Sequence, residues 1–341
     1  MVPDLLSLSA TAGCGSKIPL THMNKLLNTL EALRIPGIAT YGVLDMEDAA
    51  IHVLDDEKCL VTSLDFGTPV SSDPYVWGRV ACLHALSDIY AMGATPIGAL
   101  SILGLPSSVD EDMTNHVLRG ARDALIEASS LLMGGHTVRM PIPIFGLSVI
   151  GTAVSNQIMW SYNCQPGQKL ILTKPIGTGI VISARKAGLA SLAAVESAEG
   201  VMSSSNRAAA ERAVQAGIRA ATDVSGYGLV GHLHAMLKAS LCAAILDVAA
   251  VPVLEQALLL VEGDAVVPNN AENTMFELEQ YVDWRDTPLA LRFVFTDPQT
   301  SGGLLLAAEP QQVSALEAFG TVIGAVTEGA PGTISCVGSR L

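Results

Sequence analysis

The distribution of apolar and polar positions predicts alternating strands and helices along most of the chain. Short apolar runs that are rich in β-branched residues and bounded by turn residues are typical of strands. In the first half, such runs lie at residues 51–54, 60–64, 97–103 and 144–154. Helical spacing of apolar positions occurs at residues 24–33, 75–92 and 111–132, and Gly134-Gly135 is expected to stop the last of these helices.

The second half continues this alternation. Strands are expected at residues 169–174, 243–248, 291–296, 303–308, 321–326 and 333–337. Helices are expected at residues 178–189, 203–221, 228–238 and 311–319, whereas residues 262–287 are polar and rich in loop-forming residues. The whole pattern predicts an α/β (α+β) fold of two domains, each a sheet covered by helices.

Chain length and a local change in composition indicate where these domains divide. The chain has 341 residues, which is more than a single core usually holds. Ser, Asn, Gln and Gly gather around residues 155–168, so we expect a boundary near residue 160. We predict a flexible Gly-rich segment at residues 1–40, a first domain at 41–158 and a second domain at 159–341.

The helix expected at residues 75–92 has an unusual charge pattern. Between residues 80 and 100, Asp88 is the only formally charged side chain, and apolar residues cover most sides of the helix. A buried ionised carboxylate is costly unless something compensates its charge. Because no Lys or Arg lies nearby in the sequence, a divalent cation is the simplest compensation. Asp88 therefore indicates a metal site.

Other acidic residues occur at similar positions. Asp45, Glu47 and Asp48 crowd together just before a predicted strand, and on this segment alone an exposed acidic turn is the simpler interpretation. Asp65 is expected to end a strand and precede a turn, where α/β folds often place ligand contacts. An Asx turn that caps the strand is the alternative. Asp223, with Ser225, is expected to begin a helix, as a cap or as a contact to a metal-bound phosphate.

Composition narrows the possible partners. Aromatic residues make up 4% of the chain and the net charge is −14, which argues against a nucleic-acid partner. Carboxylates can still hold a small phosphorylated ligand through divalent cations. No apolar run reaches membrane-spanning length, and the first residues lack the pattern of a signal peptide, so we expect a cytoplasmic protein with no membrane partner.

The cysteines point to a reducing compartment. The six of them are scattered without a CxxC pair, and five are expected to be small core residues. The exception lies in Gly13-Cys14-Gly15-Ser16-Lys17, where an ammonium near a thiol would favour the thiolate. On the segment alone, a flexible loop with an incidental cysteine is the simpler interpretation.

Three sequence patterns concern nucleotide binding. Gly135-His136-Thr137 is expected in a loop between a helix and a strand, where it could contact a phosphate or ribose. A GxGxxG pattern begins at Gly226, but we reject a dinucleotide site because residues 208–221 before it are Ala-rich and helical in pattern rather than a strand. The sequence contains no GxxxxGK[ST], so any ATP must be bound by another scaffold.

Nine segments in one order carry a more specific signal. They are AGCGSK, EDAA, SLDF, ALSDIYAMGATPI, GGHT, PIFGLSVIGT, LTKPIGTGI, ATDVSGYGLVGHL and FTDPQTSGGLLLA. Together they resemble the selenophosphate synthetase (selenide, water dikinase) family, of the aminoimidazole-ribonucleotide-synthetase-like superfamily. The resemblance implies that superfamily's two-domain fold and a Mg²⁺-assisted phosphoryl transfer. In this reaction ATP, hydrogen selenide and water give selenophosphate, AMP and phosphate.

The resemblance also implies roles for particular residues. Cys14 and Lys17 match catalytic positions, and Lys17 would also contact the nucleotide. The metal positions are matched by Asp48, Asp88 and Asp223, of which Asp88 would also contact the nucleotide. Nucleotide contacts are matched by Asp45, Met46, Glu47, Asp65, Gly135, His136 and Thr137, with Asp65 also near metal. The first domain would bind ATP and Mg²⁺ and form a homodimer through its strands.

The chain departs from the family pattern at several positions. His84 stands where Asn is usual, and Gly67 replaces an aromatic residue. Residues 268–273 lack the glycines and the arginine that the family commonly has there, and Ser16 replaces a second cysteine of some members. Two alternatives therefore remain open: another ATP-dependent enzyme of the superfamily, or a non-catalytic nucleotide-binding homologue. The Gly13–Lys17 thiol segment favours selenophosphate synthesis over the first of these.

Overall fold

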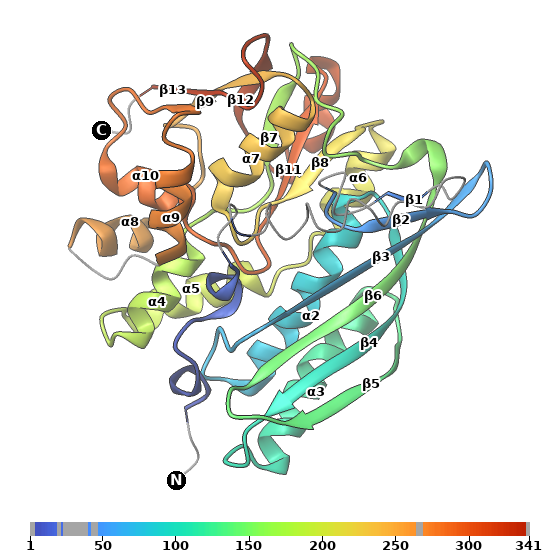
Figure 1. Ribbon diagram of the computed structural model, residues 1–341, viewed down its shortest axis with the longest axis vertical. Helices are drawn as coiled ribbons and strands as arrows, with labels where there is room; N and C mark the ends of the chain where they lie inside the picture. The colour runs from blue at the N-terminus through green and yellow to red at the C-terminus, as the bar shows by residue number, and fades with distance from the viewer. Residues whose placement is uncertain (1–3, 19–21, 23–39, 42–46, 264–268, 339–341) are drawn as a thin grey trace.

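Helix α2 (Pro74–Ala91) lies between two sheets and packs against both halves of the molecule (Figure 1). The computed structural model describes residues 4–18, 22, 40–41, 47–263 and 269–338. Asp73 caps α2 by accepting a hydrogen bond from the backbone N–H of Tyr75, and Pro74 occupies the first turn, where its missing N–H costs nothing. The expected helix at 75–92 is thus confirmed.

The first sheet belongs to residues 40–154. Its strands are β1 (Thr40–Tyr41), β2 (Ala50–Val53), β3 (Lys58–Gly67), β4 (Thr95–Leu105), β5 (Leu132–Arg139) and β6 (Ile144–Val154), in the order β1-β2-β3-β6-β4-β5. Helices α2 and α3 (Glu111–Glu127) lie along one face of the sheet (Figure 1). On β3, Cys59 and Val61 are buried, whereas Leu64 and Phe66 on the opposite face are each 51% exposed. This face therefore remains open in the described part of the chain.

The second sheet belongs to residues 169–337. Its strands are β7 (Lys169–Leu172), β8 (Ala220–Asp223), β9 (Ala243–Asp247), β10 (Val282–Asp283), β11 (Leu304–Ala308), β12 (Thr321–Thr327) and β13 (Ile334–Val337), in the order β10-β13-β9-β12-β7-β11-β8. Its helices are α4 (Thr178–Lys186), α5 (Leu192–Met202), α6 (Arg207–Gln215), α7 (Gly228–Ala239), α8 (Glu255–Glu262), α9 (Asn269–Glu277) and α10 (Leu289–Thr296). Short 3₁₀ turns occur at η1 (Leu5–Leu8), η2 (Gly13–Ser16), η5 (Ser155–Gln157) and η6 (Pro310–Leu316). The predicted α/β fold of two helix-covered sheets is confirmed.

Several predicted elements of the first half are wrong at their ends. β3 continues to Gly67, so Asp65 lies inside a strand rather than at its end. α3 stops at Glu127, and residues 134–137 form part of β5 instead of a loop after a helix. The sequence is misleading here because two adjacent glycines usually end a helix, whereas these pair with β4 at the edge of the sheet. The helix expected at 24–33 lies outside the described residues.

Three predictions in the second half are also wrong. Residues 291–296 belong to helix α10, because an apolar segment of eight residues is too short to separate a strand from a helix. The Ala-rich helix stops at Gln215, ahead of Gly217 with φ +81°, and residues 220–223 form strand β8. Asp223 therefore ends a strand instead of beginning a helix. The polar stretch expected as a loop at 262–287 contains α9 and β10.

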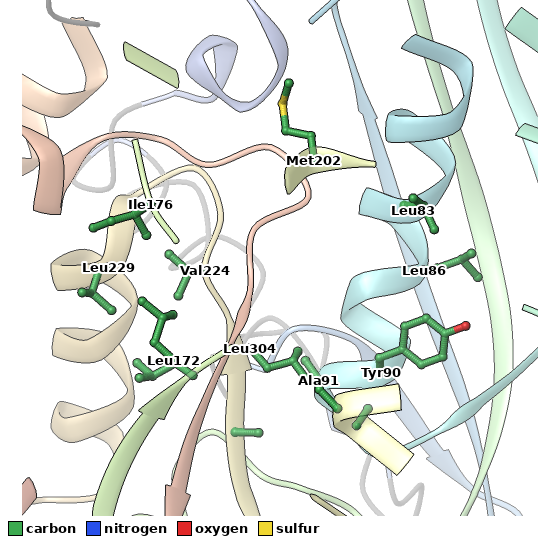
Figure 2. Packing of buried hydrophobic residues seen from close by; sticks show 14 of the residues in the cluster. Leu83, Leu86, Tyr90, Ala91, Leu172, Ile176, Met202, Val224, Leu229 and Leu304 are labelled. Atoms are coloured by element: carbon green, nitrogen blue, oxygen red, sulfur yellow. The ribbon is translucent and has the colours of Figure 1, made fainter. Parts of the chain in front are cut away.

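The hydrophobic core is continuous between the two halves. Figure 2 shows Leu83, Tyr90 and Ala91 of α2 in the same buried cluster as Val224 and Leu304 of the second half. This packing fixes α2, and every polar side chain it carries, at the boundary between the sheets. Within the described part of the chain, no helix combines the length and apolar character needed to cross a membrane.

Candidate functional site

Acidic side chains from both halves converge at the boundary that α2 occupies. Asp48 precedes β2, Asp88 lies on α2, and Asp223 ends β8. Ligand atoms of Asp48, Asp223 and His232 lie within 4.8 Å of one another. Asp48 Oδ1 accepts a hydrogen bond from Thr222 Oγ1 at 2.8 Å, and Asp88 accepts one from the hydroxyl of Ser63. The acids predicted as metal ligands therefore lie near one another at this boundary.

The ionised carboxylates of Asp48 and Asp88 are destabilised by their surroundings. Burial raises the pKa of Asp48 well above its usual value, and the charges of Asp223 and Asp88 raise it further. Burial likewise raises the pKa of Asp88, together with the charges of Asp65 and Asp223. The Oδ2 atoms of Asp48 and Asp223 are buried and accept no hydrogen bond from the described residues. Such a set of oxygens fits a divalent cation that prefers carboxylate ligands, as Mg²⁺ does.

His232 on α7 belongs to this cluster, although no pattern in the sequence singles it out. The Ser225 backbone N–H donates to His232 Nε2 at 3.1 Å. Burial lowers the pKa of this imidazole to about 4, so its ring is neutral at physiological pH. The signal that could have found it is its place one turn into the helix that follows Asp223.

Asp65 on β3 lies between two basic side chains, Lys17 and His84. Lys17 Nζ lies 3.6 Å from Asp65 Oδ1, and His84 Nε2 lies 3.2 Å from Asp65 Oδ2. Burial disfavours the ammonium of Lys17, but the charges of Asp65, Cys14 and nearby acids raise its pKa overall. Although burial opposes ionisation of Asp65, the charges of Lys17 and His84 lower its pKa. Asp65 therefore links a lysine to a histidine.

Cys14 lies next to this linked set. Its side chain is 2% exposed, and its sulfur lies 2.8 Å from His84 Nε2. The Cys14 backbone N–H donates to Thr300 Oγ1 at 3.0 Å, which attaches the η2 turn to the second half. A Cβ at Gly13 would meet Thr300 Oγ1 at 2.2 Å, so this approach requires glycine. All six cysteines are buried free thiols.

Contacts from both halves hold the segment that carries Cys14 and Lys17. On the first half, Thr68 Oγ1 donates to the carbonyl of Thr11 at 2.9 Å. On the second half, Lys186 Nζ donates to the carbonyl of Ser9. The Lys17 side chain passes over Gly226, where a Cβ would lie 2.6 Å from Lys17 Cδ. The glycine of the rejected dinucleotide pattern therefore makes room for Lys17.

Two other predicted nucleotide contacts differ in their distance from the acids: the charge of Glu47 helps to raise the pKa of Asp48, whereas Gly135 lies farther away. Glu47 is buried, and its carboxylate accepts hydrogen bonds at 3.1 Å from the backbone and hydroxyl of Ser161. Gly135 on β5 is aligned with Asp65 across the sheet through Ser101 and Leu147, three strand spacings or about 14 Å away.

The remaining predicted nucleotide contacts are either exposed on β5 or lie outside the described residues. His136 lies on the open face opposite Ile102, and both His136 and Thr137 are exposed. One copy of the chain therefore does not bring residues 135–137 to the acids. Asp45 and Met46 lie outside the described residues.

Comparison with known proteins identifies the family. Residues 46–153 match the AIR synthase related protein N-terminal domain, and residues 165–337 match its C-terminal domain. The chain is 38% identical over 304 residues to a selenide, water dikinase of Desulfitobacterium hafniense (strain Y51), covering 89% of this chain and 88% of the relative. It is 36% identical over 341 residues to that of Myxococcus xanthus (strain DK1622), covering 97% and 96%.

The fold is also shared with a solved structure. Thiamine-monophosphate kinase from Stenotrophomonas maltophilia K279a matches with a TM-score of 0.66 at 21% identity, covering 93% of this chain and 96% of that one. This agreement confirms the predicted two-domain aminoimidazole-ribonucleotide-synthetase-like fold. Its two domains and its full-length relatives place the chain in the selenide, water dikinase family of the AIR synthase related proteins.

Proposed function

We propose that this protein is a selenide, water dikinase that converts ATP, hydrogen selenide and water into selenophosphate, AMP and phosphate. The observation that supports this most directly is the meeting of a thiol, an ammonium and buried acids at one boundary. Cys14 and Lys17 reach this boundary from the N-terminal segment, while Asp48, Asp88 and Asp223 reach it from both halves. A phosphoryl transfer to a small anion needs positioned charges of this kind.

Asp48, Asp88 and Asp223 would hold Mg²⁺. Bound there, the ion would neutralise charge on the ATP phosphates and stabilise charge that develops during transfer. The support is the pair of buried carboxylate oxygens to which no described residue donates a hydrogen bond, together with the raised pKa of Asp48 and Asp88. Asp65 would contact the nucleotide from β3. Asp88 would contact it from α2.

Lys17 and Cys14 would act at the phosphate that is transferred. The Lys17 ammonium, held by Asp65, is placed to bind an anionic oxygen. The buried sulfur of Cys14 offers a site for selenium chemistry that bulk water does not reach. The segment at residues 1–40 would then serve as the catalytic cover of a first domain at 41–158, with a second domain at 159–341.

Residues 135–137 would act in a homodimer. Leu64 and Phe66 on β3 and Leu100 on β4 form an exposed apolar face, and His136 lies on the same side. A second copy seated on this face would cover it and bring residues 135–137 toward a neighbouring site. Asp45, Met46 and Glu47 would contact the nucleotide ahead of Asp48. We place the reaction in the cytoplasm because the cysteines are free thiols.

The dimer can be tested by sedimentation. Phe66→Asp should give a monomer because it puts a charge in the middle of the apolar face. Leu192→Asp serves as the matched control, since Leu192 is 71% exposed and lies on helix α5 of the second half, not on the first sheet. A wild-type protein that sediments as a monomer at micromolar concentration would contradict the dimer.

The activity is tested by selenide-dependent AMP formation from Mg·ATP. Wild-type protein should form AMP and selenophosphate only when selenide is present, whereas Cys14→Ser and Asp88→Asn should form neither. AMP formation that ignores selenide would favour another ATP-dependent enzyme. Nucleotide binding without turnover at any selenide concentration would favour a non-catalytic homologue.

A further inference from the structure

His84 makes three polar contacts that together determine which atom of its ring carries a proton. The Ser301 backbone N–H points at Nδ1 at 3.3 Å, while Nε2 faces Cys14 Sγ at 2.8 Å and Asp65 Oδ2 at 3.2 Å. A nitrogen that accepts from an amide carries no proton, so the neutral ring must carry it on Nε2. His84 itself is 5% exposed, and these contacts fix the orientation of its ring.

The charges around His84 lead to the same assignment. Burial disfavours the imidazolium, but the charges of Cys14 and Asp65 raise the pKa of His84 to about 10. The Ser301 amide favours the neutral ring and the two charges favour the protonated ring. In both states Nε2 carries a proton. The sulfur of Cys14 is therefore the acceptor of this hydrogen bond, a role that suits a thiolate better than a thiol.

The sulfur of Cys14 lies beside apolar side chains, so a charge on it needs the hydrogen bond from His84. A small cavity of about 20 Å³ lies beside Cys14 and His84, and its other walls include Val70, Trp77 and Phe145. A thiolate against such apolar walls is costly without a hydrogen-bond donor. Among the described residues, the other titratable groups around Cys14 and His84 are Lys17 on the same segment as Cys14, Asp65 on β3 and Tyr227 ahead of α7.

We propose that His84 is a positioning residue that donates its Nε2–H to the Cys14 sulfur and keeps it as an oriented thiolate facing the site. This inference deepens the proposed function and rests on it for its catalytic consequence. The residue stands where the family resemblance leads us to expect Asn, whose shorter amide would not reach the sulfur from the same backbone position. The chain has therefore replaced a short side chain by one that contacts Cys14 directly.

The test compares three substitutions of His84 that differ in where they place a donor. In His84→Gln the amide nitrogen can occupy the place of Nε2, in His84→Asn it lies near the place of Nδ1, and His84→Ala has no donor. Alkylation of Cys14 by iodoacetamide is followed against pH in the full chain, with the modified peptide quantified by mass spectrometry. His234→Asn is the matched control, because His234 on α7 is also buried but bonds to the Gly332 carbonyl.

The midpoint of the Cys14 alkylation profile should rise by about one pH unit in His84→Ala and His84→Asn. It should stay near the wild-type value in His84→Gln and in His234→Asn. Because a midpoint does not depend on how far the segment opens, a general loosening of the fold would not mimic this pattern. Equal midpoints in wild type and all three variants would overturn the proposal. A shift in His84→Gln as large as in His84→Ala would overturn the assignment of Nε2–H as donor.

The same variants separate this inference from the proposed function. In the AMP assay, His84→Ala should lower kcat at least tenfold with an unchanged KM for ATP, and His84→Gln should recover most of the loss. If wild type makes no selenophosphate but the alkylation midpoints shift as expected, the proposed function fails and the Cys14–His84 hydrogen bond stands. If wild type is active and the midpoints do not shift, only the role of His84 fails.

Discussion

The two ends of the site deal with buried charge in different ways. At the acid end, Asp48, Asp88 and Asp223 repel one another, and no described residue donates a hydrogen bond to the buried Oδ2 atoms of Asp48 and Asp223. At the thiol end, Cys14, His84, Asp65 and Lys17 alternate between acceptor and donor. Among the described residues the charges of the thiol end are therefore paired with one another, whereas the acid end would gain stability from a bound cation.

The strongest test of this difference is removal of one acid. Asp223→Asn should abolish AMP formation and at the same time raise the Tm of the metal-free protein, because it removes a buried repelling charge. Each kcal/mol gained corresponds to roughly 2–4 °C in domains of this size. Thermal unfolding with and without Mg²⁺ measures both effects, since the variant should also lose the stabilisation by Mg²⁺. A metal-free variant less stable than wild type would contradict the description of the acid end.

At the thiol end, removal of one charged side chain should lower the Tm of the metal-free protein instead of raising it. Lys17→Met should lower kcat by about 100-fold or more, as loss of a positioned cation usually does. It should also lower the Tm of the metal-free protein, because Asp65 then keeps a buried charge with one partner fewer. Lys169→Met at the exposed start of β7 is the control for loss of a lysine. Unchanged Tm in Lys17→Met would show that the Lys17–Asp65 pair contributes nothing to folding.

Stability should depend on pH through the acid end. The raised pKa of Asp48 and Asp88 means that the folded protein keeps protons that the unfolded chain releases above pH about 4. The free energy of unfolding of metal-free protein should therefore fall as pH rises from about 5 to 7, and Mg²⁺ should flatten this slope.

Asp88→Asn is the matched control for that slope. Burial raises the pKa of Asp297 to about 8 and lowers that of His232 to about 4, so both also affect the pH dependence. Asp297 and His232 are present in both wild type and Asp88→Asn. The difference between the two proteins in the pH dependence of the free energy of unfolding therefore reports the contribution of Asp88 and the acids it interacts with. Urea titrations at pH 5, 6 and 7 provide the measurement. Equal slopes in the two proteins would exclude Asp88 as a source.

The smallest expected effect concerns the attachment of the η2 turn. Thr300→Val removes the acceptor of the Cys14 backbone N–H and should cost about 1 kcal/mol of local stability. Alkylation of Cys14 at fixed pH should then become roughly fivefold faster because the segment opens more often. Thr11→Val serves as the control, since its carbonyl rather than its hydroxyl accepts the hydrogen bond from Thr68. No change in alkylation would show that other contacts hold the turn.

The sequence allowed Asp88 to be selected as a candidate metal ligand because the cost of burying its charge could be judged locally, whereas Asp48 and Asp223 were selected as metal positions through the family resemblance. Asp88 stands alone in an apolar helix, and this isolation is visible without coordinates. His84 could not be selected in the same way, because its partners Cys14, Asp65 and Ser301 are far away along the chain. His232 was missed for a similar reason, since its partner Asp223 belongs to another element.

The errors in secondary structure have a common cause. Residues 134–137 and 291–296 are short segments whose local preferences suit more than one conformation. Pairing with β4 turns the first into an edge strand, and packing on the second half turns the other into helix α10. Long apolar segments bounded by turn residues, such as α2 and β6, were predicted almost to the residue.

Asp48 and Asp223 belong to different halves of the molecule, and this has a mechanical consequence. Any movement of one half relative to the other would change the separation of the two carboxylates. A ligand bound by both carboxylates would hold the two halves together. Separating the halves would then require the ligand to leave or to lose its contact with one carboxylate. The affinity for that ligand would then be thermodynamically linked to the fraction of molecules in which the two halves are separated.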